Sequence, residues 1–428
     1  GTGKTITALK AIERNFSKNK RQFLVIIVPY LHLIDQWASD FELIGITNYL
    51  EIARSKNTWL SKLKNLIWDY NKGFRDRVVL IGSYKSMANV DFQILLSYVN
   101  EGRFLVADEC HNIGSQSYKD NIFHAFDYRL GLSATPKRWW DEDGTKRIYD
   151  LFKKTVFEFD IEDAISSGFL TEYLYYPQLV RLNYTEIEDY EMYSDRIAVM
   201  LSKKIKTKED KIQLEKLLRY RANILQGAEE KIPKFLELIR MQEDKRFTLV
   251  YCAVGEVDKI IKLLFKEGIK AHRFNYEVSP KERKNILELF AKGDIEVLVA
   301  IKCLDEGVDV PATRVAYLLS STSNPREFVQ RRGRILRLSE NKNHSIIYDF
   351  ITIQSGLSRR TFDSIAKREI PRYAELSSLA NNRFGNDTRA KIRKMLSIYD
   401  LDLYLNMKPW EMYELMKEED GGWNEYTS

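Results

Sequence analysis

The sequence predicts an α/β protein built from two similar units in tandem, each with a parallel sheet covered by helices. In the first 170 residues, short apolar runs alternate with longer helical stretches, and residues 245–352 repeat this arrangement. The runs are continuous, which is typical of strands buried on both faces, as in a parallel sheet between helical layers. The expected strands are Phe23–Val28, Val78–Ile81, Phe104–Ala107, Arg129–Leu132, Phe247–Ala253, Ala271–Phe274, Glu296–Ile301, Val315–Ser320 and Ser345–Phe350.

The stretch between the two units, from about residue 184 to residue 240, has a different character. It is charged and rich in leucine, and it contains almost no Gly or Pro before Gly227 and Pro233. Its apolar residues recur three or four positions apart, which predicts helices, and the residues after 352 have the same pattern. The expected domains are a first domain at 1–180, a helical linker at 181–240, a second domain at 241–352 and a helical C-terminal tail at 353–428.

Composition narrows the class of protein only slightly. The 428 residues include 67 Lys and Arg against 61 Asp and Glu, and this net charge of +6 permits a nucleic-acid partner without requiring one. The three cysteines have no C-x-x-C spacing, which excludes a disulfide framework and indicates a reducing cytosol. No apolar run approaches the roughly 18 residues that a membrane span needs. We therefore expect a cytoplasmic protein with no membrane partner.

The first five residues, Gly1-Thr2-Gly3-Lys4-Thr5, match the last part of a phosphate-binding P-loop, and a helical stretch follows them. In such a loop, Gly lets backbone N–H groups curl around phosphates, Lys neutralises their charge, and the Thr hydroxyl binds Mg²⁺. The N-terminus of the next helix adds a favourable partial positive charge. A glycine turn before a helix would give the same letters, so this motif alone leaves a purely structural alternative open.

Residue 1 is Gly rather than Met, and it already lies within this motif. We expect the earlier Gly of the loop, its preceding strand and the adenine contact to lie upstream of residue 1. For the chain as given, we accordingly expect weak or absent binding of ATP.

A pair of acidic residues, Asp108-Glu109, directly follows the buried run Phe104–Ala107 and precedes Cys110-His111. The carboxylates therefore emerge at the C-terminal end of a strand, where ligands bind in open α/β sheets. Asp108 is expected to hold Mg²⁺, through water, while Glu109 polarises the attacking water. A solvated acidic turn is the alternative for these two residues, and a P-loop about a hundred residues upstream argues against it.

Together with further motifs in a fixed order, these residues resemble the DExH-box helicases of superfamily 2. The further motifs are Val28-Pro29 with Leu33 and Gln36-Trp37, Gly82-Ser83-Tyr84 with Ser86, the third motif Ser133-Ala134-Thr135-Pro136, the fifth motif Leu304–Pro311, and the sixth motif Gln330–Arg337. Asp108–His111 is the second motif of the family. The resemblance covers about residues 1–352. It implies two tandem RecA-like P-loop domains, ATP and Mg²⁺ as cofactors, and nucleic acid as a partner.

The resemblance also assigns roles to single positions. The residues implied to contact nucleic acid are Pro29, Gln36, Ser83, Tyr84 and Lys302. The residues implied to couple hydrolysis to strand grip are His111, Ser133 and Thr135. The nucleotide-binding residues are Gly1, Thr2, Gly3, Lys4, Thr5, Gly307 and Asp309, with Thr5 and Asp108 at the metal.

Two positions depart from the family pattern. Many relatives carry a Thr shortly before the acidic pair of the fifth motif, in the stretch that Ile301-Lys302-Cys303 fills here, and Lys302 is the candidate for a phosphate contact. In the second motif, Cys110 replaces the Ala of better-known subgroups, a swap of one small residue for another.

The sixth motif supplies the positive charge that phosphoryl transfer requires. Negative charge spreads over the transferred group in the transition state, and an arginine finger stabilises it. Arg334 and Arg337 are three residues apart, so on a helix they would share a face, and Gln330 lies one turn earlier. Because these residues and Glu109 lie in different domains, we expect catalysis to require that the two domains close around one triphosphate.

We interpret the chain as an ATP-dependent nucleic-acid translocase or helicase. The segments after the third motif and before the sixth resemble type III restriction subunits, which favours DNA, a restriction or defence context and a separate nuclease partner. A narrower resemblance is to the helicase-like protein of phosphorothioation-linked DNA restriction. An RNA helicase and an ATPase-dead scaffold of a defence complex remain as alternatives, and the sequence leaves the direction of movement and the oligomeric state open.

Overall fold

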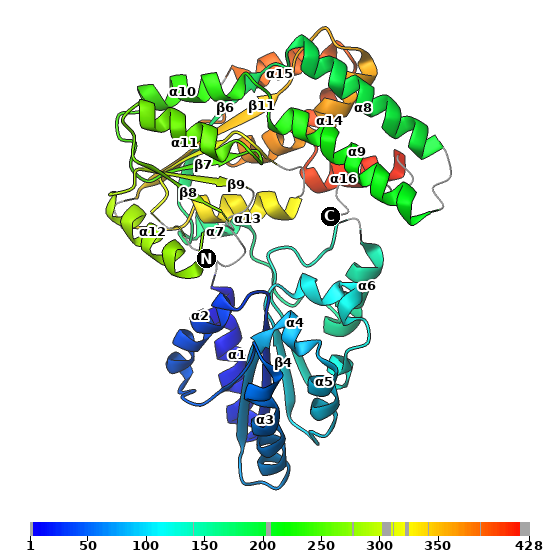
Figure 1. Ribbon diagram of the computed structural model, residues 1–428, viewed down its shortest axis with the longest axis vertical. Helices are drawn as coiled ribbons and strands as arrows, with labels where there is room; N and C mark the ends of the chain where they lie inside the picture. The colour runs from blue at the N-terminus through cyan, green and yellow to red at the C-terminus, as the bar shows by residue number, and fades with distance from the viewer. Residues whose placement is uncertain are drawn as a thin grey trace. The chain divides into compact units, whose positions relative to one another are not determined.

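The computed structural model describes residues 3–139, 141–202, 207–275, 278–301, 310, 312–321, 325–340, 342–385 and 387–419. The chain divides into two compact units, Gly1–Phe159 and Asp160–Ser428, each of which has its own parallel sheet (Figure 1). The predicted α/β class with two tandem units is therefore confirmed.

The sheet of the first unit has the strand order β2-β3-β1-β4-β5 within the described residues. Its strands are β1 (Gln22–Val28), β2 (Leu50–Ile52), β3 (Arg77–Ser83), β4 (Arg103–Ala107) and β5 (Tyr128–Gly131). The central strand β1 is buried along its whole length and pairs in parallel with both β3 and β4. In this register Ile27 lies opposite Gly82 on one side and Ala107 on the other, so the strands end at the same edge of the sheet.

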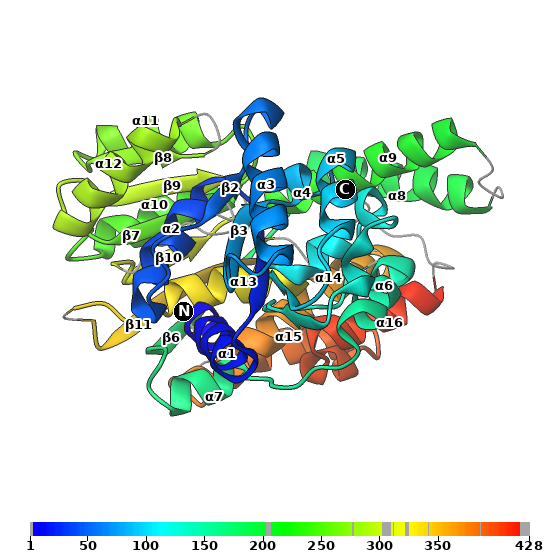
Figure 2. The ribbon, with the colours of Figure 1, turned by 90° about the horizontal axis from the view of Figure 1, so that it is seen from below.

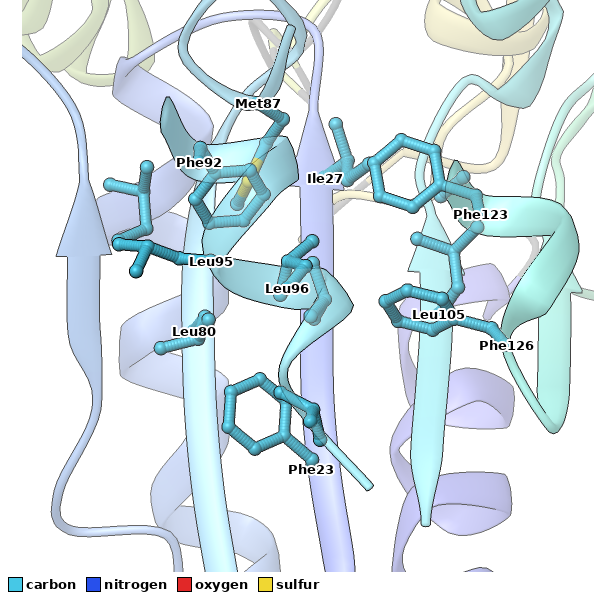
Figure 3. Close-up of a cluster of buried hydrophobic side chains, with 14 of the residues drawn as sticks. Phe23, Ile27, Leu80, Met87, Phe92, Leu95, Leu96, Leu105, Phe123 and Phe126 are labelled. Atoms are coloured by element: carbon cyan, nitrogen blue, oxygen red, sulfur yellow. The ribbon is translucent and has the colours of Figure 1, made fainter. Parts of the chain in front are cut away.

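Helices cover both faces of this sheet, which explains why the apolar runs are continuous. Side chains of α1 (Lys4–Asn19) and α2 (His32–Phe41) pack on one face. On the other face pack side chains of α3 (Lys56–Asn71), α4 (Tyr84–Met87), α5 (Val90–Ser97) and α6 (Glu142–Phe152). Figure 3 shows the second of these cores, where Phe92 and Leu96 of α5 lie over Phe23 and Leu80.

The sheet of the second unit has the order β6-β11-β10-β7-β9-β8 within the described residues (Figure 2). Its strands are β6 (Glu172–Val180), β7 (Thr248–Cys252), β8 (Ala271–Phe274), β9 (Val297–Ile301), β10 (Val315–Leu318) and β11 (His344–Thr352). The second unit also contains α7 (Ile161–Ser166), α10 (Lys231–Met241), α11 (Val257–Lys266), α12 (Pro280–Lys292), α13 (Pro325–Ile335), α14 (Arg359–Ser378), α15 (Thr388–Ser397) and α16 (Pro409–Glu419). Side chains of α10 and α11 pack on one face of the sheet, and α13 and α14 lie against β10 and β11 on the other.

Strand β6 was not predicted from the sequence, and it corrects the end of the expected first domain. It pairs with β11 from Glu172 opposite His344 to Val180 opposite Thr352, so it belongs to the second sheet although it lies within 1–180. As an edge strand it alternates between buried and exposed positions, and it contains Pro177, which lacks a backbone N–H. A search for continuous apolar runs passes over such a strand. The remaining domain ranges stay predictions.

Two long helices occupy the charged stretch that follows β6. They are α8 (Tyr184–Ser202) and α9 (Lys208–Gln226), and Ile197 of α8 packs with Leu214, Leu217 and Leu218 of α9. Thr207 and Asp210 form a reciprocal capping box at the start of α9. The leucine spacing in the sequence therefore reflects the contact between these two helices.

Helix α14, the first helix after β11, is buried almost all round, and it carries charged residues into the interior of the second unit. Arg372 is 3% exposed, and its guanidinium lies 3.1 Å from Oδ2 of Asp349 and 2.9 Å from Oε2 of Glu369. The hydroxyl of Tyr175 donates to the same Asp349 oxygen at 2.9 Å. Burial raises the pKa of Asp349, whereas Arg372 lowers it. These contacts join β11, β6 and α14 through one buried cation.

We expect Arg372→Met to lower the free energy of unfolding by about 3–5 kcal/mol, because the change leaves Asp349 and Glu369 buried without their cation. Chemical denaturation followed by circular dichroism measures the loss. The matched control is Arg360→Met, since Arg360 pairs with Asp195 at 2.7 Å but both side chains are exposed. That variant should change stability by less than about 1 kcal/mol, and equal losses in the two variants would contradict the role of the buried network.

Candidate functional site

The end of the P-loop motif forms the start of a helix, as the sequence predicts. Gly3 adopts a left-handed conformation with φ of 74°, and α1 begins at Lys4. The backbone N–H and the hydroxyl of Thr7 both donate to the carbonyl of Gly3, at 2.9 and 3.0 Å. The first turn of α1 contains no acidic residue, so its free N–H groups and Lys4 present positive charge that fits a phosphate group. Gly1 and Thr2 lie outside the described residues.

The acidic pair lies where β4 ends, and the carboxylate of Asp108 is held at both oxygens. Its Oδ1 accepts a hydrogen bond from the backbone N–H of Glu109 at 3.0 Å, and its Oδ2 accepts one from Nε1 of Trp37 at 3.1 Å. Glu109 itself has φ of 46° and ψ of 56°, a left-handed conformation that is uncommon for a residue with a side chain. The chain therefore turns sharply between the two carboxylates.

Tyr84, which directly follows β3, stabilises that turn. Its hydroxyl lies 2.9 Å from the carbonyl oxygen of Asp108 and 3.3 Å from that of Glu109. The side chain is 4% exposed, and burial raises its pKa well above the usual value. The resemblance implied that Tyr84 contacts nucleic acid, but the structure turns this side chain inward to the acidic pair.

His111 connects the acidic motif to the third motif. It is fully buried, and its Nδ1 lies 3.3 Å from Oγ of Ser133 and 3.4 Å from Oε2 of Glu109. The same Ser133 oxygen accepts a hydrogen bond from the backbone N–H of Thr135 at 3.1 Å. The three residues expected to couple hydrolysis to strand grip are thus brought together with the expected catalytic carboxylate.

The Cys110 thiol is influenced by Lys4 as well as by the acidic pair. Burial, together with Glu109 and Asp108, raises the pKa of Cys110 to about 12, and Lys4 acts in the opposite direction. The two carboxylates and the ammonium group of Lys4 therefore act on the same thiol. This set fits ATP with Mg²⁺: Lys4 and the start of α1 suit phosphates, and the Asp108 carboxylate and the Thr5 hydroxyl are the oxygen ligands that Mg²⁺ prefers.

The other expected nucleic-acid contacts of the first unit lie at the ends of β1 and β3. Pro29 follows β1 and is partly buried, whereas Gln36 is exposed on α2. Ser83 is 7% exposed, and its hydroxyl caps α4 by accepting from the backbone N–H of Ser86 at 3.2 Å. A Cβ at Gly82 would lie 2.3 Å from the carbonyl oxygen of Ile52, so only Gly fits at that point of the motif. Lys302 lies outside the described residues.

The sixth motif only partly has the expected helical form. Gln330 and Arg334 lie on α13, but α13 ends at Ile335, so Arg337 lies beyond it. The expectation that Arg334 and Arg337 share a helix face is therefore wrong. The physical reason is that Arg337 forms an antiparallel bridge with Leu170, and the N–H of Thr171 donates to the carbonyl of Leu336 at 2.8 Å. Gly307 and Asp309 lie outside the described residues.

Residues outside the motif hold α13 in place, and sequence reasoning missed them. Nζ of Lys342 lies 2.5 Å from the carbonyl oxygen of Ile335 and 2.8 Å from that of Arg337, and burial lowers the pKa of Lys342 to about 7. Arg332 of α13 forms a buried ion pair with Glu375 of α14 at 2.7 Å. Within the motif, Arg331 donates to the carbonyl of Ser320 at 2.8 Å. Only the spatial neighbourhood reveals these partners, which are up to 43 residues away in the sequence.

Two family models match the chain, one in each unit. Residues 1–138 match the type III restriction enzyme res subunit, and residues 230–339 match the helicase conserved C-terminal domain.

Two known proteins match most of this chain. DNA 3'-5' translocase XPB2 of Sulfurisphaera tokodaii is 25% identical over 389 residues, which cover 84% of this chain and 78% of that protein. Putative DNA 3'-5' helicase Rad25 of Haloarcula marismortui is 25% identical over 379 residues, or 86% of this chain and 52% of that protein. The chain thus spans between about half and three quarters of the length of these two relatives.

Solved structures show the same fold. The Hef helicase domain of Pyrococcus furiosus has a TM-score of 0.52 at 18% identity and covers 85% of this chain and 93% of that one. The type ISP restriction-modification enzyme LlaBIII bound to DNA has a TM-score of 0.58 at 14% identity, over 96% of this chain and 31% of that one.

The fold and the residues of the first unit fit a P-loop ATPase. The two family models, matched to residues 1–138 and 230–339, make the chain similar to the helicase-type ATPases of superfamily 2. Among the helices of the described residues, none has both the length and the apolar character needed to cross a membrane.

Burial of Cys110 leads to a pH-dependent prediction. With the pKa raised to about 12, only about one thiol in ten thousand is ionised at pH 8. We expect the peptide that contains Cys110 to stay unmodified when the native protein is exposed briefly to iodoacetamide at pH 8, as measured by mass spectrometry. The same peptide should react in strong denaturant, where an ordinary thiol pKa is restored. Rapid modification in the native protein would show that the turn at Glu109, which buries Cys110, opens.

Proposed function

We propose that this chain is an ATP-dependent DNA translocase, with or without strand separation. The observation that carries the proposal is the contact of His111 with both Glu109 and Ser133, because it joins the expected hydrolytic carboxylate to the motif that couples hydrolysis to strand grip. The choice of DNA is supported by the names of the relatives, which are a DNA 3'-5' translocase and a putative DNA 3'-5' helicase.

The proposed roles follow from the geometry of the first unit. Bound ATP with Mg²⁺ supplies the phosphoryl group that is transferred to water. Lys4 and the N-terminus of α1 neutralise phosphate charge, and Asp108 and Thr5 hold the metal. Glu109 orients the attacking water and takes up its proton, with a side chain aimed by the left-handed turn and by His111.

In the second unit, we propose that Arg334 and Arg337 stabilise the charge of the same transferred group. Gln330 lies on α13 with Arg334 and is proposed to contact the nucleotide or the attacking water. Gly307 and Asp309 are proposed to bind the nucleotide, and Lys302 is proposed to contact the strand. Lys342 and Glu375 hold α13 in place. This attachment supports a role for the helix in catalysis, where side chains must be positioned accurately.

The cellular setting is a further part of the proposal. A restriction or defence context is supported by the match of residues 1–138 to the type III restriction res subunit. A separate nuclease partner remains a prediction from the sequence. The likeness to LlaBIII supports the fold alone, and the link to phosphorothioation remains a prediction from the sequence.

Comparison of nucleic acids tests the function directly, with a protein in which the complete P-loop precedes Lys4 in this test and in the later tests that involve ATP. The rate of ATP hydrolysis should be measured with single-stranded DNA, duplex DNA and RNA of matched length and sequence, at the same ionic strength because salt dominates such affinities. We expect duplex or single-stranded DNA to stimulate hydrolysis most. Greater stimulation by RNA would favour an RNA helicase, and no hydrolysis under any condition would favour a nucleic-acid-binding scaffold.

We expect Glu109→Gln to lower kcat for ATP hydrolysis at least about a hundredfold while ATP binding survives, because the amide cannot take up a proton. Hydrolysis is measured by phosphate release, and binding by fluorescence of an ATP analogue. Glu51→Gln on the exposed side of β2 is the matched control and should behave like the unchanged protein. A loss of nucleotide binding equal to the loss of rate would contradict the assignment.

We expect Arg334→Ala to slow hydrolysis about a thousandfold and to weaken nucleotide binding far less, because an arginine finger contacts charge that develops in the transition state. Arg393→Ala removes an exposed arginine from α15 and serves as the control for lost positive charge. Parallel losses of affinity and rate would show that Arg334 contributes uniform binding instead.

A further inference from the structure

Two buried aromatic side chains hold the acidic pair, and neither is explained by the chemistry of hydrolysis. Trp37 donates to the carboxylate of Asp108, and Tyr84 donates to the carbonyl groups of Asp108 and Glu109. They come from α2 and α4, the helices that follow β1 and β3. These helices belong to the segments for which the resemblance implied contact with nucleic acid.

The bond from Trp37 fixes the side chain of Asp108. Trp37 is 1% exposed, and it lies on α2 with its ring centroid 6.5 Å from that of Phe41, so packing restricts where its indole can point. An indole N–H can only donate, and a buried donor needs an acceptor, which here is Oδ2 of Asp108 at 3.1 Å. Outer hydrogen bonds of this kind orient carboxylates that bind metals. A shift of α2 would therefore change the presentation of Asp108 to a metal ion.

The bond from Tyr84 fixes the backbone rather than a side chain. The left-handed conformation of Glu109 is unfavourable for a residue with a side chain and persists only where the surroundings hold it. The hydroxyl of Tyr84 does so through the carbonyl of Asp108, at 2.9 Å. Tyr84 is the first residue of α4, and its neighbour Ser83 caps that helix. A shift of α4 would therefore change the direction of the Glu109 side chain.

Each of these segments also presents polar groups toward solvent. Gln36 is exposed and directly precedes the buried Trp37, because neighbouring residues on a helix point about 100° apart. Lys85 is exposed and directly follows the buried Tyr84. A strand that contacts the exposed residues would thus act on helices whose inner sides are hydrogen-bonded to the acidic pair.

We propose that Trp37 and Tyr84 are positioning residues that make the geometry of Asp108 and Glu109 depend on the occupancy of the strand-binding segments. This proposal rests on the proposed function, since it explains how nucleic acid stimulates hydrolysis. Trp37 acts on the metal ligand and Tyr84 acts on the residue that orients water, so their loss has different consequences.

The test uses Trp37→Phe and Tyr84→Phe, which remove the donor and keep an aromatic ring in the core. Two controls remove similar atoms from the same unit away from the acidic pair. Trp59→Phe shortens a buried tryptophan that packs at the edge of Phe92, and Tyr70→Phe removes a hydroxyl that donates to the carbonyl of Glu101 at 3.2 Å. A general loss of packing should affect each control as much as its matched variant.

The first measurement is the Mg²⁺ concentration required for half-maximal binding of a fluorescent ATP analogue, without nucleic acid. We expect Trp37→Phe to raise it at least about tenfold, because loss of an outer hydrogen bond costs metal affinity by that order. Tyr84→Phe and both controls should leave it within about twofold. An unchanged Mg²⁺ requirement in Trp37→Phe would overturn the role of Trp37, whatever nucleic acid does to the protein.

The second measurement is the ratio of kcat with saturating DNA to kcat without DNA, together with DNA affinity from fluorescence anisotropy. We expect Tyr84→Phe to lower the ratio about tenfold or more while DNA affinity stays within twofold, and Tyr70→Phe to change neither quantity. A Tyr84→Phe variant that keeps the full ratio, or that loses DNA affinity to the same extent, overturns the coupling. If the unchanged protein is stimulated by no nucleic acid, the proposed function and the coupling both fail, whereas the Mg²⁺ measurement still decides whether Trp37 positions Asp108.

Discussion

The parallel pairing of β1 with both β3 and β4 is the constraint on which the candidate site depends. Because all three strands run in the same direction and in register, the segments that follow them leave the sheet at one edge. Trp37, Tyr84 and Asp108 are far apart in the sequence, but each follows one of these strands closely. A network of short hydrogen bonds can therefore form among segments 24 to 71 residues apart. The sheet topology therefore determines where the site lies, and the motifs supply its residues.

The sequence was sufficient for the parts of the fold that are buried on both sides. Continuous apolar runs predicted the strands β1, β3, β4, β7, β9, β10 and β11 to within a few residues. The expected strands included the edge strands β5 and β8 but missed the edge strands β2 and β6, and β6 escapes the criterion because its pattern alternates between buried and exposed positions. The criterion also set the end of the first domain too late, since pairing between β6 and β11 joins residues more than 160 apart and leaves no trace in local composition.

Motifs supplied candidate residues for the site but did not show which way their side chains point. Ser83 and Tyr84 were assigned to strand contact through the resemblance, yet one hydroxyl caps α4 and the other supports the backbone of the acidic pair. Tyr and Trp each combine a large apolar surface with one polar atom, so either residue can stand at a surface or in a core with its polar atom satisfied. The residue type alone does not show whether a Tyr or Trp lies at a surface or in a core. The sequence motif also did not show that α13 ends before Arg337. The reason is a contact with distant residues: Leu170 pairs with Arg337, and Thr171 donates to the carbonyl of Leu336.

The second unit shows why a helical tail outside both family models belongs to the structural core. Helix α14 buries Arg368, Glu369, Arg372 and Glu375, and buried ion pairs contribute little net stability compared with apolar residues of the same size. Their value lies in specificity: an apolar contact tolerates sliding, whereas the pair of Arg332 with Glu375 at 2.7 Å is satisfied in one register only. Charge stabilisation in a transition state requires donors placed to a fraction of an ångström, which favours a helix fixed by such pairs over one that is merely packed. The burial of charge on α14 therefore matches what α13 needs if its arginines act in catalysis.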